Sequence, residues 1–329
     1  MKKISQPLIV ITGGAGFIGS CFVRYLNDQG IDHIVIVDKL GKSEKWKNLV
    51  GKRFYHFIEK ESFFPWLKEH EALVGPIIHL GACTDTMEND AAYLVENNYQ
   101  FSVNLAEFAL SKGKRFIYAS SAATYGNGAQ GFNDDCNQLF HLSPLNMYGY
   151  SKQLFDQWAK MQGVLDQIVG LKFFNVFGPN EWHKGRMASA VIKMVQQIEK
   201  KEAIKLFKTT KPNQFADGEQ KRDFIYVKDV VKMIYPFLTN QVGGLFNIGS
   251  AIASTWNELA KAVCLAMNEK INIEYIDMPK ELVEKYQNYS CADMSKTKKT
   301  IGHHAASCIS LNEAVHNYVN HHLLTHCSW

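Results

Sequence analysis

Apolar and polar residues in the first half of the chain follow the pattern of strands that alternate with helices. A β-branched apolar run at residues 8–11 ends in glycines, and a second run at residues 34–38 follows a helical pattern over residues 17–29. These segments predict a β-α-β unit. Further buried strands are expected at residues 76–80, 115–120 and 168–174, with helices at residues 91–112 and 151–162. The alternation is typical of an α/β protein with a Rossmann-type, doubly wound parallel sheet.

This alternation changes after about residue 179. A basic segment at residues 193–211 and a polar turn at residues 212–221 interrupt it before strand and helix signals resume at residues 224–238. Residues 244–248 are again strand-like and could return to the sheet. We therefore expect an NAD(P)-binding Rossmann domain over residues 1–178, with return segments near residues 224–250. A smaller substrate-binding α/β lobe is expected over residues 179–329.

Composition narrows the class of protein. The 329 residues are 46% hydrophobic and carry a formal net charge of +4. Because the lysines are scattered along the chain, we expect no nucleic-acid partner. The seven cysteines include no C-x-x-C pair, which argues against a disulfide framework and a zinc site. The histidines between residues 303 and 326 also lack the spacing of a metal site, so no metal is expected.

The apolar segments bear on the cellular compartment of the protein and on whether it enters a membrane. The first 11 residues differ from a secretory signal, because a short apolar run leads directly into glycines. No apolar run reaches the length that a bilayer-spanning segment needs. We expect a cytoplasmic protein that does not enter the membrane.

A glycine-rich turn joins the first predicted strand to the first predicted helix. Gly13, Gly16 and Gly19 stand in a G-x-x-G-x-x-G arrangement. Glycine permits the positive φ of a tight turn and lets a pyrophosphate approach the backbone, while the helix N-terminus offers N–H groups to that anion. The position between a strand and a helix therefore predicts a dinucleotide site rather than a purely structural turn.

The second predicted strand ends in an acid that bears on the choice of dinucleotide. Asp38 follows the glycines by about 20 residues, where an acid accepts hydrogen bonds from the adenosine ribose. Taken alone, Asp38 favours NAD. However, Lys39, Lys42 and Lys45 lie in the same loop and could neutralise a ribose 2′-phosphate. We therefore favour NADP and keep NAD as the alternative.

A serine, a tyrosine and a lysine form the candidate catalytic group. Ser121 follows a predicted strand, and Tyr148 and Lys152 have Y-x-x-x-K spacing at the start of a predicted helix. Side chains at i and i+4 share a helix face, so Lys152 is expected to lower the phenol pKa from about 10 and to reach the nicotinamide ribose. The phenol could then accept a proton near neutral pH, while Ser121 hydrogen-bonds the reacting oxygen.

Longer stretches of the chain resemble one family over nearly its whole length. These stretches are residues 10–20, 81–83, 96–100, 118–126, 144–152, 174–179, 183–185, 221–227 and 286–287. Together with the glycine turn and the Y-x-x-x-K pair, they are similar to the ADP-L-glycero-D-manno-heptose 6-epimerase family of extended short-chain dehydrogenase/reductases. Residues 119–126 and 183–185 distinguish this family from other sugar epimerases.

The resemblance implies an isomerase that inverts C6″ of an ADP-activated heptose. Hydride would leave C6″ for the nicotinamide, giving a transient ketone, and would return to the opposite face, so that NADP stays tightly bound. The product would serve lipopolysaccharide inner-core assembly. The resemblance also implies a homo-oligomer, which is a pentamer in that family.

The resemblance assigns roles to individual residues. Tyr148 and Lys184 would handle protons on the two faces of the sugar, with support from Lys152 and Ser121. Cofactor contacts beyond the glycine turn carry over to Phe17, Ile18, Asp38, Lys39, Lys45, Lys60, Gly81, Ala82 and Asn97. Substrate contacts carry over to Asn175, Lys184, Phe207, Arg222 and Tyr286, and to Arg186 and Lys193, which replace the serine and histidine usual in the family.

Several of these assignments have alternatives. Lys184 could instead contact a phosphate or lie at the surface. To act as a general base, it would need a pKa that burial has lowered. Arg222 could bind a diphosphate with its planar fork or form a salt bridge with Asp223. Tyr286 could stack on adenine or only pack.

Other activities compete with this interpretation. A UDP-hexose 4-epimerase or 4,6-dehydratase would share the fold, but a dehydratase needs an acid/base carboxylate pair where this chain has Ala122 and Ala123. A non-catalytic nicotinamide sensor is a more distant alternative, since such proteins commonly lose the tyrosine or the lysine.

Overall fold

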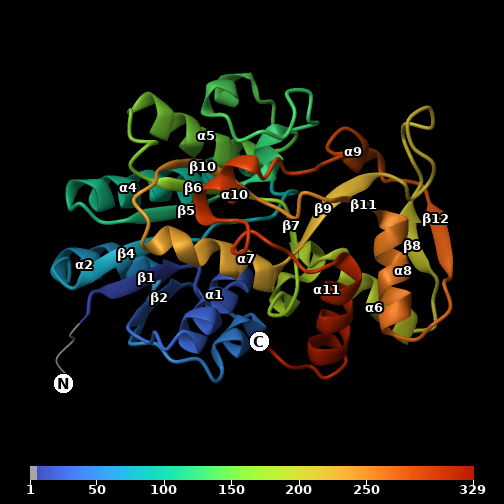
Figure 1. The fold of residues 1–329 in the computed structure, drawn as a ribbon, viewed down its shortest axis with the longest axis horizontal. Helices are drawn as coiled ribbons and strands as arrows, with labels where there is room; N and C mark the ends of the chain where they lie inside the picture. Colours follow the sequence, from blue (N-terminus) through green and yellow to red (C-terminus); the bar gives the residue numbers. More distant parts are fainter. Residues whose placement is uncertain (1–5) are drawn as a thin grey trace.

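Seven parallel strands form the central sheet of the protein (Figure 1), in the order β10-β6-β5-β4-β1-β2-β3. The computed structural model describes residues 6–329. The strands are β1 Leu8–Thr12, β2 Ile34–Asp38, β3 His56–Glu59, β4 Val74–His79, β5 Phe116–Ser121, β6 Val169–Phe173 and β10 Gly244–Ile248. The central strands are near-continuous apolar runs because both faces of the sheet are covered.

The order of the strands creates a crevice at the carboxyl ends. The chain runs from β1 outward to β3 and then crosses to β4 on the other side of β1. Such a reversal of strand order is where open α/β sheets bind ligands. The expected Rossmann-type doubly wound sheet is confirmed.

Helices pack in two groups around this sheet. In the first group, Phe63 and Phe64 of α2 (Phe63–Glu69) contact Phe101 at the start of α4 (Phe101–Ser111). In the second group, α1 (Phe17–Asp28) packs against α7 (Val227–Ile234). Helix α5 (Met147–Met161) packs on β5 and carries the Y-x-x-x-K pair.

The second half of the chain builds two smaller sheets. Strands β11 (Ala253–Thr255), β9 (Lys221–Tyr226) and β7 (Asn175–Phe177) form one sheet, and β12 (Ile273–Ile276) pairs with β8 (Ile204–Phe207) in the other. Figure 1 shows β8 and β12 with α6 and α8 at the end of the molecule away from β1 and β2. The remaining helices are α3 Ala91–Leu94, α6 Ala190–Glu199, α8 Trp256–Ala266, α9 Lys280–Val283, α10 Ser295–Ile301 and α11 Leu311–Tyr318.

The predicted strands and the first helix are confirmed with small shifts at their ends, but three elements differ. The helix expected over residues 91–112 contains a π-helical segment, η3 (Val95–Gln100), between α3 and α4. The basic segment is not an interruption, because its start belongs to α6, whose apolar positions Val191, Ile192, Met194 and Val195 are buried. Strand β3 was not expected, since it is short and half exposed. Among the helices of residues 6–329, none has the length and apolarity needed to cross a bilayer.

Candidate active site

A cavity of about 760 Å³ opens at the carboxyl ends of the central strands. It is walled by the glycine turn after β1, the end of β5, the start of α5, and residues of the second half of the chain. A neighbouring cavity of about 430 Å³ shares Gly13, Asp38, Lys45 and Gly81 with it. The two cavities are therefore parts of one continuous cleft.

The glycine turn fits a dinucleotide. Gly13 has φ +70°, and a Cβ placed on it would lie 2.6 Å from the Gly81 backbone nitrogen. A Cβ on Gly19 would collide with the Gly13 carbonyl oxygen. These two glycines let β1, α1 and the loop after β4 approach one another. Gly16, Phe17 and Ile18 then present the N-terminus of α1 to the cavity, where its N–H groups suit a pyrophosphate.

The end of the cleft next to β2 combines an acid with lysines. The Asp38 carboxylate accepts hydrogen bonds from the Ala15 backbone N–H at 2.9 Å and from Lys45 Nζ at 2.9 Å. Lys39 is exposed and pairs with Glu61 at 2.9 Å. Lys60, Asn97 and Lys42 line the same cavity, and Lys60 Nζ donates to the Asn97 amide oxygen. This donor set suits both ribose hydroxyls and a ribose phosphate.

The three catalytic candidates meet in the larger cavity. Ser121 ends β5, and Tyr148 lies in the first turn of α5, which begins four residues earlier than expected. Asn146 caps this helix, since its side-chain oxygen accepts from the Gly149 N–H at 2.8 Å. The cap fixes the direction in which Tyr148 and Lys152 leave the helix.

Burial controls the protonation of these groups. The pKa of Tyr148 is raised by burial, with the hydrogen bond from Ser121 acting in the opposite direction. Burial lowers the pKa of Lys152 to about 8, while the Asp156 carboxylate opposes that change. Lys152 Nζ donates to the Ala119 carbonyl oxygen at 2.9 Å. The net pKa of Tyr148 is thus raised and not lowered, because desolvation is the largest influence on the phenol.

Lys184 lines the same cavity from η6 (Trp182–Met187). Its ammonium lies 5.5 Å from the centre of the Phe17 ring, and burial lowers its pKa, as base duty requires. The neighbouring His183 is held by Asn48, whose amide also donates to the Ala15 carbonyl oxygen at 3.0 Å. This connection fixes the Lys184 segment against the glycine turn.

Three substrate candidates also line the cavity. They are Asn175, Arg222 and Tyr286. The Arg222 guanidinium lies 4.8 Å from the centre of the Tyr286 ring. The alternative salt bridge to Asp223 is wrong, because that carboxylate accepts from the backbone N–H groups of Ser250 at 2.7 Å and Ala292 at 2.9 Å. Arg222 Nη1 donates to the Lys221 carbonyl oxygen at 2.9 Å, and the remaining N–H groups of the guanidinium are available to an anion.

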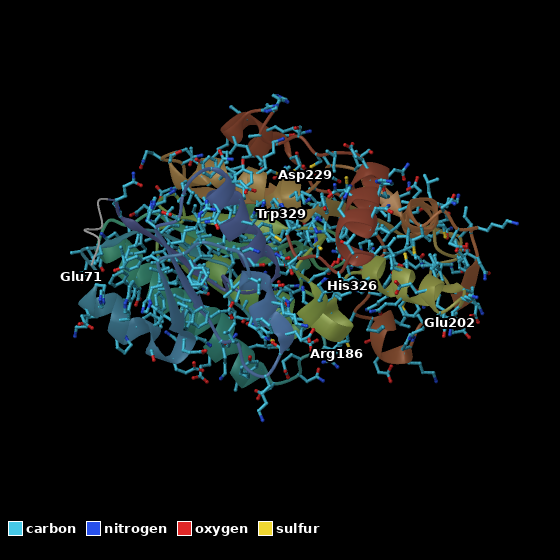
Figure 2. All side chains as sticks on the ribbon, turned by 90° about the horizontal axis from the view of Figure 1, so that it is seen from below. Glu71, Arg186, Glu202, Asp229, His326 and Trp329 are labelled. Carbon is cyan, nitrogen blue, oxygen red and sulfur yellow. The ribbon has the colours of Figure 1, made fainter. Side chains whose placement is uncertain are left out.

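The structure does not bring the other three substrate candidates into the wall of this cavity. The Arg186 side chain, labelled in Figure 2, is 68% exposed and pairs with Asp85. Lys193 Nζ donates to the Arg186 carbonyl oxygen at 2.8 Å. The Phe207 ring lies behind Tyr286, with 6.4 Å between the ring centres.

Two residues at the site had no role in the sequence analysis. Gln287 lines the cavity and its amide nitrogen donates to the Gly126 carbonyl oxygen at 2.6 Å. Asn98 accepts from the Cys83 N–H at 2.8 Å and donates to Ser151 Oγ at 3.0 Å. Both fall within the stretches that carry the family resemblance, but their partners are distant in sequence. Only a contact in the folded chain could reveal their function.

Known proteins resemble the chain in sequence and in fold. The NAD dependent epimerase/dehydratase family matches residues 9–249. An ADP-L-glycero-D-manno-heptose-6-epimerase from Nitratidesulfovibrio vulgaris is 47% identical over 323 residues, which are 96% of this chain and 98% of that protein. A protein of the same name from Fusobacterium nucleatum is 44% identical over 328 residues, covering 96% of this chain and 98% of that protein.

Solved structures agree with the described fold. The crystal structure of the Helicobacter pylori ADP-L-glycero-D-manno-heptose-6-epimerase has a TM-score of 0.78 and 27% identity, covering 98% of this chain and 99% of that chain. A UDP-N-acetylglucosamine 4-epimerase from Methanobrevibacter ruminantium has a TM-score of 0.81 and 23% identity, covering 98% of this chain and 100% of that chain. The second likeness shows the fold alone.

Proposed function

The chain belongs to the NAD dependent epimerase/dehydratase family, and from that premise we propose that it interconverts the D-glycero and L-glycero epimers of ADP-D-manno-heptose at C6″. The observation that carries the proposal is that Tyr148 and Lys184, from α5 and η6, line one cavity beside the glycine turn. Inversion needs a general acid/base group on each face of the sugar. The relatives named as heptose epimerases support the choice of substrate.

The residues of this cavity divide the chemistry among them. A bound nicotinamide would accept hydride from C6″ and return it. Tyr148 would exchange the hydroxyl proton on one face and Lys184 on the other, while Ser121 would hydrogen-bond the oxygen. Arg222 would pair with the diphosphate through its planar fork. Because burial raises the Tyr148 pKa, the phenol needs positive charge nearby to act as a proton acceptor, and Lys152 would supply it.

The same proposal includes the choice between NADP and NAD, the cellular compartment and the oligomeric state. The family depends on a nicotinamide cofactor. Lys39, Lys45 and Lys60 beside Asp38 support NADP, and NAD is the alternative. By resemblance, the protein is a cytoplasmic homo-oligomer, a pentamer, whose product enters lipopolysaccharide inner-core assembly.

The test is a direct assay of purified protein with each ADP-heptose epimer and with UDP-glucose as a separate substrate. We expect both ADP-heptoses to reach the same epimer mixture, measured by chromatography. Tyr148→Phe should lower that rate by roughly 10²–10⁴-fold, the usual contribution of a general acid or base. Conversion of UDP-glucose without conversion of either ADP-heptose would contradict the proposal. Denaturing the protein and identifying the released nucleotide decides between NADP and NAD.

A further inference from the structure

A buried ion pair joins β6 to α5, next to the residues that carry the candidate catalytic side chains. Lys172 on β6 and Asp156 on α5 are 1% and 0% exposed, and Lys172 Nζ lies 2.6 Å from Asp156 Oδ2. Neither side chain belongs to the wall of the cavity that residues 6–329 form. The pair therefore cannot reach a ligand bound there, and its effect on the site must pass through its neighbours.

Lys172 connects to the backbone of the catalytic serine. Its ammonium donates to Thr124 Oγ1 at 2.7 Å, and the Thr124 hydroxyl in turn donates to the Ser121 carbonyl oxygen at 2.8 Å. Ser121 also stands opposite Phe173, the residue after Lys172, in the pairing of β5 with β6. Through Thr124, the ammonium thus holds the turn after β5 in place.

Asp156 connects to the residues on either side of the Lys152 acceptor. Its carboxylate accepts from Ser120 Oγ at 2.7 Å and from the Tyr118 hydroxyl at 2.9 Å. Between these two residues lies Ala119, whose carbonyl oxygen accepts from Lys152 Nζ. Asp156 also follows Lys152 by one helical turn on α5, so the two side chains share a face.

Stability alone does not account for this pair. Removing two charges from water costs several kcal/mol per ion, and well-packed apolar residues of similar volume are often as stable or more stable. The pair instead has partners on β5, β6 and α5, the elements that carry Ser121 and Lys152. In addition, the negative charge of Asp156 opposes the lowering of the Lys152 pKa by burial.

We propose that the Asp156–Lys172 ion pair is a positioning device that holds Ser121 in place, and that its Asp156 carboxylate keeps the Lys152 ammonium charged. It acts through these two residues and touches neither substrate nor cofactor. The part of the inference that concerns turnover rests on the proposed function, whereas the part that concerns Lys152 does not.

The first measurement is the titration of Lys152 in protein without substrate. Reaction with cyanate, which modifies only the neutral amine, can be followed at several pH values by mass spectrometry of the peptide that contains Lys152. Asp156→Asn should raise the reactivity of Lys152 at pH 7 by about fivefold, because a pKa lowered by about one unit from about 8 raises the neutral fraction of the amine from about 9% to about 50%. Asp229→Asn is the matched control, because this buried carboxylate on α7 (labelled in Figure 2) accepts from the Ile309 N–H, far along the chain from α5.

The second measurement separates positioning from folding. The double variant Asp156→Leu with Lys172→Met removes both charges and keeps apolar volume, so it should still fold. It should melt several degrees below wild type, because the buried Tyr118 and Ser120 hydroxyls lose their acceptor. Its kcat should nevertheless fall by about tenfold to a hundredfold, with KM within about twofold, because displaced catalytic groups slow the reaction more than they weaken binding. Should Asp156→Asn not fold, the double variant is also used for the cyanate titration.

The outcomes distinguish this inference from the proposed function. Lys152 reactivity that equals wild type in a folded variant, together with unchanged kcat, would overturn the positioning role. If wild-type protein converts neither ADP-heptose, the proposed function fails, and the cyanate titration alone decides the inference.

Discussion

At the scale of single residues, burial is the dominant influence on the candidate catalytic groups. It raises the pKa of the Tyr148 phenol and lowers the pKa of the Lys152 and Lys184 ammonium groups. Desolvation favours the neutral form of each group, so an acid and a base move in opposite directions. The pKa values of the phenol and of the two ammonium groups, which are close together in water, are therefore moved apart, and each group is held nearer to its neutral form.

Replacing Lys184 tests the second proton handler. Lys184→Met should lower epimerisation in both directions by roughly 10²–10⁴-fold, because one face of the sugar loses its acid/base group. Lys193→Met is the matched control, since the Lys193 ammonium donates to a backbone carbonyl outside the cavity wall. The control should stay within about twofold of wild type, as expected for a surface change. Equal losses in both variants, measured as kcat/KM, would contradict the separate role of Lys184.

At the scale of elements, the turn between β1 and α1 depends on the absence of side chains. Gly13 has a positive φ and lies against the loop that follows β4, while Gly19 packs the first turn of α1 onto Gly13. The same contacts bring the N-terminus of α1 to the cavity. Packing of these elements and the binding of a pyrophosphate therefore have the same structural requirement.

Gly13→Ala and a control variant separate the effect of a positive φ from the effect of a steric clash at the Cβ position. A Cβ at Gly13 meets the Gly81 backbone, so the variant should lose about 1–3 kcal/mol of unfolding free energy and bind nicotinamide dinucleotide more weakly. Gly113→Ala is the control, because Gly113 has φ +58° but no atom within 4 Å of its Cβ position. Denaturant unfolding measures the loss of stability, and calorimetric titration with NADP measures binding. Weaker NADP binding is expected only for the Gly13 variant. Unchanged NADP binding by that variant would contradict the assigned site.

At the scale of the whole molecule, the cavity is formed where distant parts of the chain meet. Ser121 and Tyr148 come from the elements around the central sheet, whereas Arg222 and Tyr286 come from segments that follow β8 (Figure 1). Gln287 bridges these parts by donating to the Gly126 carbonyl oxygen, 161 positions away in sequence. The bridge joins the Tyr286 segment to the turn that follows β5.

Gln287→Leu should weaken this bridge with little effect on the fold. Loss of one hydrogen bond costs about 0.5–1.5 kcal/mol, which corresponds to an increase in KM of about two- to twelvefold if the bridge orders the substrate site. Gln157→Leu removes a longer amide contact of 3.4 Å, to the Leu139 carbonyl oxygen, away from the cavity and should leave KM unchanged. Steady-state kinetics with ADP-heptose compares the two variants. An unchanged KM for Gln287→Leu would show that the bridge has no part in binding.

The sequence by itself determined the local features of this protein. Apolar runs indicated the buried strands, the G-x-x-G-x-x-G turn marked a candidate dinucleotide site, and the Y-x-x-x-K spacing placed Tyr148 and Lys152 on one helix face, because each of these signals depends only on neighbours in the chain. The tertiary structure decided how those features are tuned and joined. Desolvation of Tyr148, the partners of Gln287 and the Asp156–Lys172 pair all depend on residues far apart in sequence, which spacing along the chain cannot reveal.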